Sequence, residues 1–424
     1  MTRRKKGRHG DKRTKDDDAA RAAAGDDVPP AAEDPSAAPA VSDPREASSA
    51  QPSAAPPLSR RRRLLFLSVP YVLFLALLLA CEGVVRLTLP RVSPLEALVD
   101  SPHQRQGFTD RQRVSVFEGD PLLFWRLKPN VKNVVWDFTH VSTNAQGLRH
   151  EGDLGPKPAG AIRVVCLGDS VTFGYRVPVV WPERPDEYAR DWLPYPALLE
   201  RALRAANPGR QIEVVALAVP GYTSHQGLLW LRRDIERLDP DLVTVCFGWN
   251  DIVLRPRPDS QTMSDGFLSV NFRRLMSVSQ LVTHAALRMQ RGDADAGKPA
   301  PAPQTPRVPR DEYVRNILEM ARLARERGAP AVVIAPVYRD AAHDPAESAR
   351  ISGHRDALRR AAGEAGLPFV EILELTEAGH PANSALFGEA IHPNHLGHRL
   401  MADALLKLFS EQKLLKNLYV PPGL

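Results

Sequence analysis

Five short apolar runs, separated by amphipathic stretches, most constrain what this chain can fold into. Each run is rich in β-branched residues and almost continuously apolar, as in strands buried on both faces of a parallel sheet. The predicted strands are Ile162–Leu167, Ile212–Leu217, Leu242–Phe247, Ala331–Val337 and Pro368–Ile372. The stretches between and after them predict helices over residues 196–206, 223–238, 310–327, 353–365 and 395–409. This alternation predicts an α/β fold, a flavodoxin-like three-layer sandwich around a five-stranded parallel sheet in the order 2-1-3-4-5.

Residues 161–413 are therefore the predicted α/β domain, with insertions at 175–195 and 252–309. The second insertion places Leu275, Val278 and Val282 on one helical face. Such a helix at the edge of the sheet is typical of a lid over a site, and equally of a packing or membrane-proximal helix. Residues 90–160 combine aromatic and β-branched residues with turn signals, which predicts a small β-containing pre-domain.

An uncharged stretch from Leu64 to Cys81 follows four arginines, Arg60–Arg63. Eighteen helical residues extend about 27 Å, which is close to the hydrocarbon thickness of a bilayer. We predict a transmembrane helix over residues 64–89, with the N-terminus cytoplasmic because the arginines precede it. The long preceding segment favours an uncleaved signal anchor. Lipidation at Cys81, which ends a lipobox-like sequence, and ordinary signal-peptide cleavage are the alternatives.

The tail, residues 1–63, nearly lacks large apolar side chains and is predicted to be disordered. Its 14 basic and 10 acidic residues account for +4 of the chain's net charge of +6. The remainder is close to neutral, so nucleic-acid binding, which needs a basic patch on a folded domain, is not expected. Cys81, Cys166 and Cys246 are too few for a disulfide framework, and no Cys/His cluster has metal-ligand spacing. No metal and no cofactor is expected.

Four polar or glycine positions follow predicted strands. Ser170 comes after the first strand, Gly221 after the second, Asn250 after the third, and His392 after the fifth. Because the carboxyl ends of parallel strands meet at one edge of a sheet, we expect these positions to lie close together. They supply a hydroxyl, a glycine N–H, an amide and an imidazole, which are the parts that acyl transfer requires.

The segments around these positions resemble the sequence blocks that name the SGNH (GDSL-type) hydrolases. The matching motifs are Gly168-Asp169-Ser170, Gly221, Gly248-x-Asn250-Asp251 and His392-Pro393-Asn394. The resemblance covers about residues 162 to 410. The segment Asn144–Arg149 also resembles bacterial members of the family that have an N-terminal membrane segment.

This resemblance implies a role for each position. Ser170 is the expected nucleophile and His392 its general base. The backbone N–H groups of Ser170 and Gly221 and the side-chain amide of Asn250 form the expected oxyanion hole. The family usually has Asp three residues before the His, whereas this chain has Glu389. We expect Glu389 to orient His392, with a backbone carbonyl or a water as the alternative.

Four further side chains near these motifs are polar or aromatic. Trp249 and Tyr222 are candidates for the substrate pocket, although core packing is an alternative for Trp249. His395 and His398 are expected on an exposed face of the last helix.

These inferences predict a serine esterase that hydrolyses carbohydrate- or lipid-linked O-acyl esters through an acyl-enzyme on Ser170. The predicted location is the bacterial inner membrane, with a single span over residues 64–89 and the catalytic domain outside the cytoplasm. The expected partners are a small-molecule or polysaccharide ester and the membrane; the oligomeric state is not predicted. One alternative is an O-acyltransferase acting on envelope or exported polysaccharide, and another is a non-catalytic envelope scaffold.

Overall fold

The computed structural model describes residues 59–93, 116–136, 139–177, 192–295, 304–337, 344–372, 386–388 and 391–424. Several predictions fall outside these ranges: those for residues 1–58 of the tail, 94–115 of the pre-domain, 178–191 of the first insertion, 296–303 of the second insertion, and Glu389. The predicted disorder of residues 60–63 is wrong, because the first helix begins at Arg60. The chain divides at Leu67, within its first helix, into two units, and the second unit is Ser68–Leu424.

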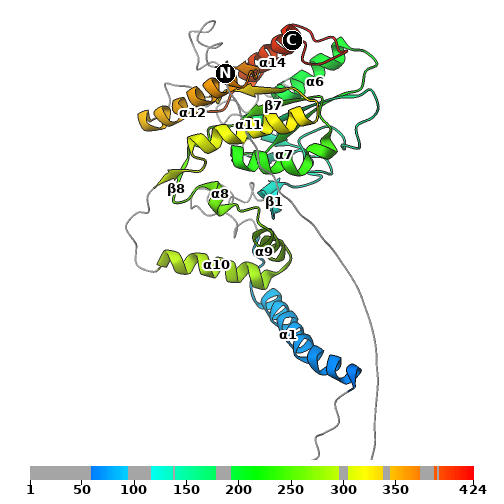
Figure 1. Ribbon diagram of the computed structural model, residues 1–424, viewed down its shortest axis with the longest axis vertical. Coiled ribbons are helices and arrows are strands. Elements are labelled where there is room, and N and C mark those ends of the chain that lie inside the picture. Colours follow the sequence, from blue (N-terminus) through cyan, green and yellow to red (C-terminus); the bar gives the residue numbers. More distant parts are fainter. Residues whose placement is uncertain are drawn as a thin grey trace, which may run out of the picture. The chain divides into compact units, whose positions relative to one another are not determined.

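A five-stranded parallel sheet forms the centre of the second unit (Figure 1). Its strands are β5 (Ile162–Gly168), β6 (Ile212–Ala218), β7 (Leu242–Cys246), β10 (Ala331–Ile334) and β11 (Phe369–Val370). They lie in the order β11-β10-β7-β5-β6, which confirms the predicted order 2-1-3-4-5. The strand β10 ends at Ile334, three residues earlier than predicted, because Pro336 has no backbone N–H to continue the ladder.

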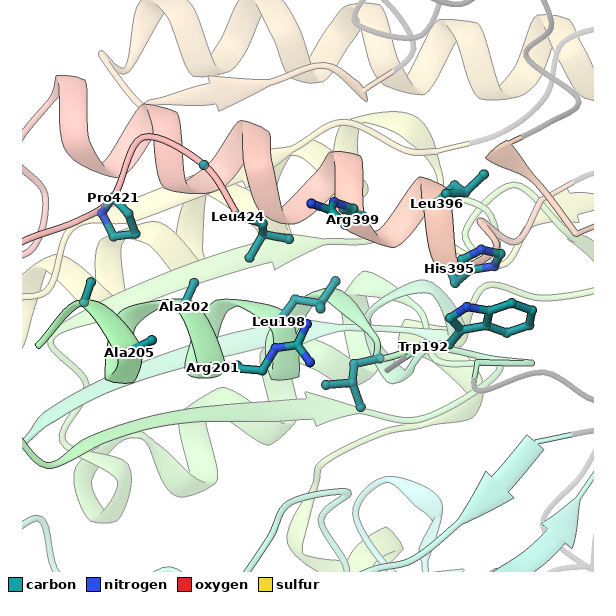
Figure 2. Close-up of a pocket in the computed structure, with 13 residues that line it drawn as sticks. Trp192, Leu198, Arg201, Ala202, Ala205, His395, Leu396, Arg399, Pro421 and Leu424 are labelled. Atoms are coloured by element: carbon teal, nitrogen blue, oxygen red, sulfur yellow. The ribbon is translucent and has the colours of Figure 1, made fainter. Parts of the chain in front are cut away.

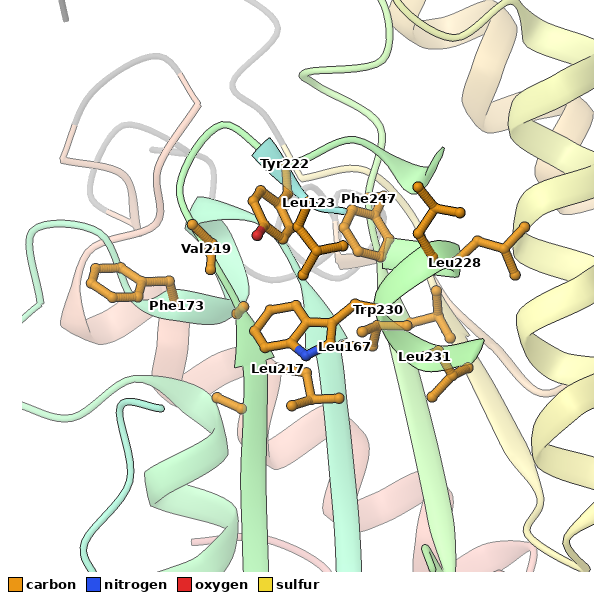
Figure 3. Close-up of a cluster of buried hydrophobic side chains, with 14 of the residues drawn as sticks. Leu123, Leu167, Phe173, Leu217, Val219, Tyr222, Leu228, Trp230, Leu231 and Phe247 are labelled. Atoms are coloured by element: carbon orange, nitrogen blue, oxygen red, sulfur yellow. The ribbon is translucent and has the colours of Figure 1, made fainter. Parts of the chain in front are cut away.

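Helices cover both faces of this sheet. On one face α7 (Ser224–Leu238) packs on α11 (Arg310–Glu326), and on the other α6 (Tyr195–Ala206) packs on α14 (His395–Glu411). Side chains alternate along each strand, so Val165 and Leu167 join the cluster under α7 and α11. Val164 and Cys166 join the second cluster, under α6 and α14. Figure 3 shows part of the first cluster, in which Leu167, Leu217, Trp230 and Phe247 gather.

The helix α12 (Pro345–Glu364) packs on α11 and beside β11. It begins eight residues before the predicted start at residue 353. Pro345 occupies its first turn, where the missing N–H costs no hydrogen bond.

Two antiparallel pairs precede the sheet in the sequence. The strand β1 (Phe117–Asp120) pairs with β2 (Phe124–Leu127), and β3 (Val134–Trp136) pairs with β4 (Thr139–Val141). Trp125 and Trp136 are buried in the same apolar cluster as the face of the sheet that α7 and α11 cover. The Trp125 indole also donates a hydrogen bond of 3.2 Å to the carbonyl of Pro220, just beyond β6. The early β pairs therefore pack directly onto the loops at the carboxyl edge.

The insertion after β7 begins and ends in a short antiparallel pair, β8 (Leu254–Arg255) with β9 (Thr305–Pro306). Between them lie α8 (Asp259–Thr262), α9 (Phe267–Val278) and α10 (Gln280–Asp295). The single helical face predicted through Leu275 and Val282 is wrong, because Ser279 is extended and separates α9 from α10.

The N-terminal helix α1 (Arg60–Thr88) has 29 residues and none of them is buried. Its most apolar 18-residue window has a mean hydropathy of 2.6. Within the described part of the chain, α1 alone is long and apolar enough to cross a membrane.

Candidate active site

Ser170 sits at a sharp turn between β5 and the short helix α5 (Ser170–Phe173). The Asp169 carboxylate accepts a hydrogen bond of 2.9 Å from the Val171 N–H and so caps this helix. A Cβ on Gly168 would lie 2.0 Å from the hydroxyl of Thr172, so the turn accepts only glycine there. The turn places the Ser170 hydroxyl at the carboxyl edge of the sheet.

His392 lies against this serine. Its Nε2 atom is 2.8 Å from the Ser170 Oγ, and only 8% of each residue is exposed. Asn394 fixes the segment, because its side chain accepts hydrogen bonds from the first N–H groups of α14. The Tyr175 ring packs on the imidazole with 4.4 Å between ring centroids. A hydroxyl held at this distance from an imidazole nitrogen is the arrangement that general-base activation of a serine requires.

The sequence analysis did not predict a role for Tyr175. It stands only five residues after Ser170, just beyond α5, but no residue pattern marks it.

Asn250 reaches the same edge from the loop after β7. Its amide nitrogen donates to the carbonyl of Tyr222 at 2.9 Å and to the Asp169 carboxylate at 3.2 Å. Asp169 is fully buried, and loss of hydration raises its pKa to about 7, against the lowering effect of the bonds from Val171 and Asn250. The two hydrogen bonds fix the orientation of the Asn250 amide. A substrate oxygen at this edge would share one of the two amide hydrogens with its present acceptor.

Gly221 follows β6 with φ +86°, a left-handed conformation that favours glycine. Arg307 holds it, since the guanidinium donates to the Gly221 carbonyl at 2.8 Å. Arg307 also donates to both oxygens of Asp259 and to the side chain of Gln226. Arg307 is 3% exposed, and Asp259 receives a further bond from the Thr223 hydroxyl. A buried ion pair therefore supports the Gly221 turn, and the sequence analysis missed it.

Asp251, next to Asn250, fixes the start of α7. It is fully buried, and one carboxylate oxygen accepts hydrogen bonds from the N–H and the hydroxyl of Ser224. Burial raises the pKa of Asp251 to about 7, while the bonds from Ser224 act in the opposite direction. The loop after β7 is thereby tied to the loop after β6.

The two pocket candidates have different surroundings. Trp249 is half-buried and packs against Ile252 and Ile351. Tyr222 is fully buried, donates its hydroxyl hydrogen to the Trp125 carbonyl and meets Trp230 edge-on (Figure 3). The structure thus places Tyr222 in the core and not at an open wall.

The two C-terminal histidines do not lie on an exposed face, so that prediction is wrong. His398 is fully buried, its Nδ1 accepts from the Tyr195 N–H at 3.2 Å, and burial lowers its pKa to about 3. His395 is half-buried and stacks on Trp192 with 3.8 Å between centroids. The reason is that α14 packs against α6, which covers this side of the helix.

A cavity of about 690 Å³ opens between α6, α14 and the C-terminus (Figure 2). Trp192, Leu198, Arg201, His395, Arg399 and Leu424 contribute to its walls. Its lining includes neither Ser170 nor His392, so we do not assign it to the reacting atoms.

Glu389 lies outside the described residues, so its orienting role stays a prediction. The described residues before and after it are joined by two backbone hydrogen bonds. The Gly388 N–H donates to the His392 carbonyl at 3.0 Å, and the Asn394 N–H donates to the Leu386 carbonyl at 2.9 Å. In the described ranges, no group of three or more His, Cys, Asp or Glu side chains is placed to hold a metal ion.

Comparison with known proteins gives a family match. Residues 166–400, a little over half of the chain, match the sequence model of the GDSL-like lipase/acylhydrolase family. No curated protein matches the chain.

Similar solved structures are distant. An alpha/beta hydrolase from the metagenome of Lake Arreo, Spain, is 20% identical, with 60% of this chain and 97% of that chain covered and a TM-score of 0.39. A lipase/acylhydrolase from Enterococcus faecalis is 17% identical, with coverages of 61% and 98% and a TM-score of 0.39. An acetylxylan esterase from Geobacillus stearothermophilus is 17% identical, with coverages of 60% and 96% and a TM-score of 0.36. Likenesses this distant assign no substrate.

Proposed function

This chain belongs to the GDSL-like lipase/acylhydrolase family and is a hydrolase that acts on esters, and we propose that it works through an acyl-enzyme on Ser170. The observation that carries the proposal is the distance of 2.8 Å between the Ser170 Oγ and the His392 Nε2. Both residues end up at one edge of the sheet although 222 positions separate them in the sequence.

The reaction begins with His392 as base. The imidazole takes the hydroxyl proton while the Ser170 oxygen attacks the ester carbonyl, and the carbonyl oxygen becomes an oxyanion. The N–H groups of Ser170 and Gly221 and the amide of Asn250 stabilise this charge. When the tetrahedral intermediate collapses, His392 donates the proton to the leaving alcohol and the acyl group stays on Ser170.

Water completes the cycle. His392 removes a proton from a water molecule, the resulting nucleophile attacks the acyl-enzyme, and Ser170 leaves with its proton restored. In this scheme Glu389 accepts from the second ring nitrogen of His392 and keeps the imidazole in the required tautomer.

The second part of the proposal concerns the membrane orientation of the chain. We infer that α1 is an uncleaved anchor over residues 64–89, that the tail 1–63 is cytoplasmic, and that the pre-domain 90–160 and hydrolase domain 161–413 lie outside the cytoplasm. Arg60–Arg63 and the apolar composition of α1 support this orientation. The proposed substrates are O-acyl esters of carbohydrate or lipid at the outer side of that membrane.

Hydrolysis of p-nitrophenyl acetate by the full chain in detergent tests the proposal. The wild type is expected to release nitrophenolate, and Ser170→Ala is expected to lose activity on the order of 10⁶-fold, as when a nucleophile is removed from a catalytic unit. Ser277→Ala, an exposed serine in α9, is the matched control and should keep full activity. Hydrolysis by Ser170→Ala at the wild-type rate would contradict the proposal.

A further inference from the structure

The helix α9 presents an apolar face that no described part of the chain covers. Phe267 and Leu268 are each 81% exposed. The face, which we call the α9 apolar face, comprises Phe267, Leu268, Phe272, Leu275 and Val278. At 100° per residue these positions span an arc of about 140°. Asn271 also lies within this arc, and its amide donates to the Phe267 carbonyl at 2.8 Å. Five apolar side chains clustered on one side of a helix still differ from singly scattered apolar residues and mark an interaction surface.

The opposite side of α9 is fixed to the rest of the unit. Arg273 and Met276 are buried on that side. The Arg273 guanidinium donates to the carbonyls of Pro121 and Ser264 and lies 4.7 Å from the centre of the Phe124 ring. These contacts fix the orientation of α9 about its own axis against the β1–β2 pair. The α9 apolar face therefore points away from that pair.

The last turns of α1 hold the junction between α9 and α10. The Glu82 carboxylate accepts hydrogen bonds from the N–H groups of Gln280 and Leu281, both at 2.9 Å, and from the Ser279 hydroxyl at 2.7 Å. Glu82 therefore caps the start of α10. Arg86 pairs with Glu82 at 2.6 Å and donates to the carbonyl of Val278, the last residue of α9, at 2.7 Å.

The segment after α1 adds further contacts. The Gln280 side chain both accepts from the Val92 N–H at 2.9 Å and donates to its carbonyl at 3.1 Å. The His284 ring lies 3.1 Å from the Pro90 carbonyl. The start of α10 is consequently tied to the segment just after α1.

We propose that the α9 apolar face lies in the interface of the bilayer that α1 crosses, so that a lipid surface is its partner. The inference rests on the proposed function in one respect, that α1 is a membrane span. Glu82 and Arg86 are the first charged residues after the apolar stretch of α1, so they mark its boundary with the headgroups. Val278 is held at Arg86, which places the end of the α9 apolar face at this same level.

A lipid surface fits this face better than a second copy of the chain does. Interfacial helices bury their apolar face about 5–10 Å into the boundary between headgroups and acyl chains. Because α1 already holds the unit at the membrane, the local concentration of lipid is high and a short helix is sufficient. Arg274 is exposed on the same helix, beside Phe267 in angular position, so its long side chain can reach the headgroup level while the α9 apolar face is buried.

Lipid quenching tests the proposal on the full chain. In a Cys81→Ser background the remaining Cys166 and Cys246 are buried. Phe272→Cys is labelled with an environment-sensitive fluorophore and reconstituted into vesicles of phosphatidylcholine and phosphatidylglycerol, with and without a nitroxide on the upper acyl chain. The label is expected to lose most of its fluorescence to the nitroxide lipid. Ser277→Cys, exposed on another side of α9, is the matched control and should keep most of it.

The outcomes separate this proposal from the proposed function. If the chain resists carbonate extraction and the label at position 272 is quenched no more than that at 277, the lipid contact is overturned while the anchor stands. If carbonate releases the chain, the anchor fails and the lipid contact fails with it. If the unlabelled Phe272→Cys variant forms an intermolecular disulfide under mild oxidation, and its labelled form escapes quenching, the partner is another chain and the proposal is wrong. Ester hydrolysis in detergent should be unchanged in both variants, which confirms their fold.

Discussion

Replacement of Arg307 by methionine should cost this protein both stability and rate. The guanidinium is 3% exposed and makes two bonds to Asp259, at 2.8 and 3.1 Å, besides those to Gly221 and Gln226. Removing one partner of a buried ion pair leaves the other charge unpaired, which typically costs about 3–5 kcal/mol. The Gly221 turn also loses its restraint, and a misplaced oxyanion donor reduces kcat by up to about 10²–10³-fold. Denaturant unfolding and p-nitrophenyl acetate kinetics on the full chain in detergent measure the two effects.

A double-mutant cycle isolates the ion pair. Asp259→Asn alone leaves Arg307 without its counter-charge, whereas the double variant leaves no buried charge unpaired. The free energy of unfolding of the double variant should therefore fall by clearly less than the sum of the two single losses. Strict additivity, or a wild-type unfolding midpoint for Arg307→Met, would refute the reasoning. A rate that stays at the wild-type value would refute only the link to Gly221.

Three further outcomes follow from the structure. Asn250→Ala should reduce kcat by about 10²–10³-fold in the same ester assay, with the unfolding midpoint showing that the fold is kept. Gly227→Ala should lower the unfolding free energy by about 1–3 kcal/mol, because its Cβ would lie 2.3 Å from the buried Phe247 ring. Asp251→Asn should gain stability relative to the wild type as the pH rises from about 4 to about 7, measured as the difference in Tm. The carboxyl of the unfolded wild type loses its proton near pH 4, whereas the buried carboxyl, with its pKa raised to about 7, keeps it. The wild type therefore loses stability over this range, and the variant does not. A pH-independent difference would contradict this assignment.

The sheet could be predicted because burial on both faces leaves a strong local signal. Residues of β5 alternate between the two apolar clusters, so both sets of side chains must be apolar. The proximity of Ser170 and His392 followed from the same logic, since parallel strands bring their carboxyl ends to one edge. In these cases a local pattern and the topology determine the placement.

Other features depend on packing between distant segments and left no local pattern. Arg307 supports a glycine 86 positions away, and nothing in its neighbourhood distinguishes it from a surface arginine. His398 was expected on an exposed face together with His395, three residues earlier in the last helix, but the side of α14 that carries it packs against α6. Tyr222 is adjacent to a site residue, yet its ring turns inward to Trp125.

Covalent labelling by a fluorophosphonate, read by mass spectrometry of the full chain, tests the central claim most directly. The proposed acyl-enzyme mechanism predicts one adduct on the peptide that contains Ser170, much slower labelling of His392→Ala, and none on that peptide in Ser170→Ala. An adduct on a different serine, or ester hydrolysis by a chain in which Ser170 never reacts, would contradict it.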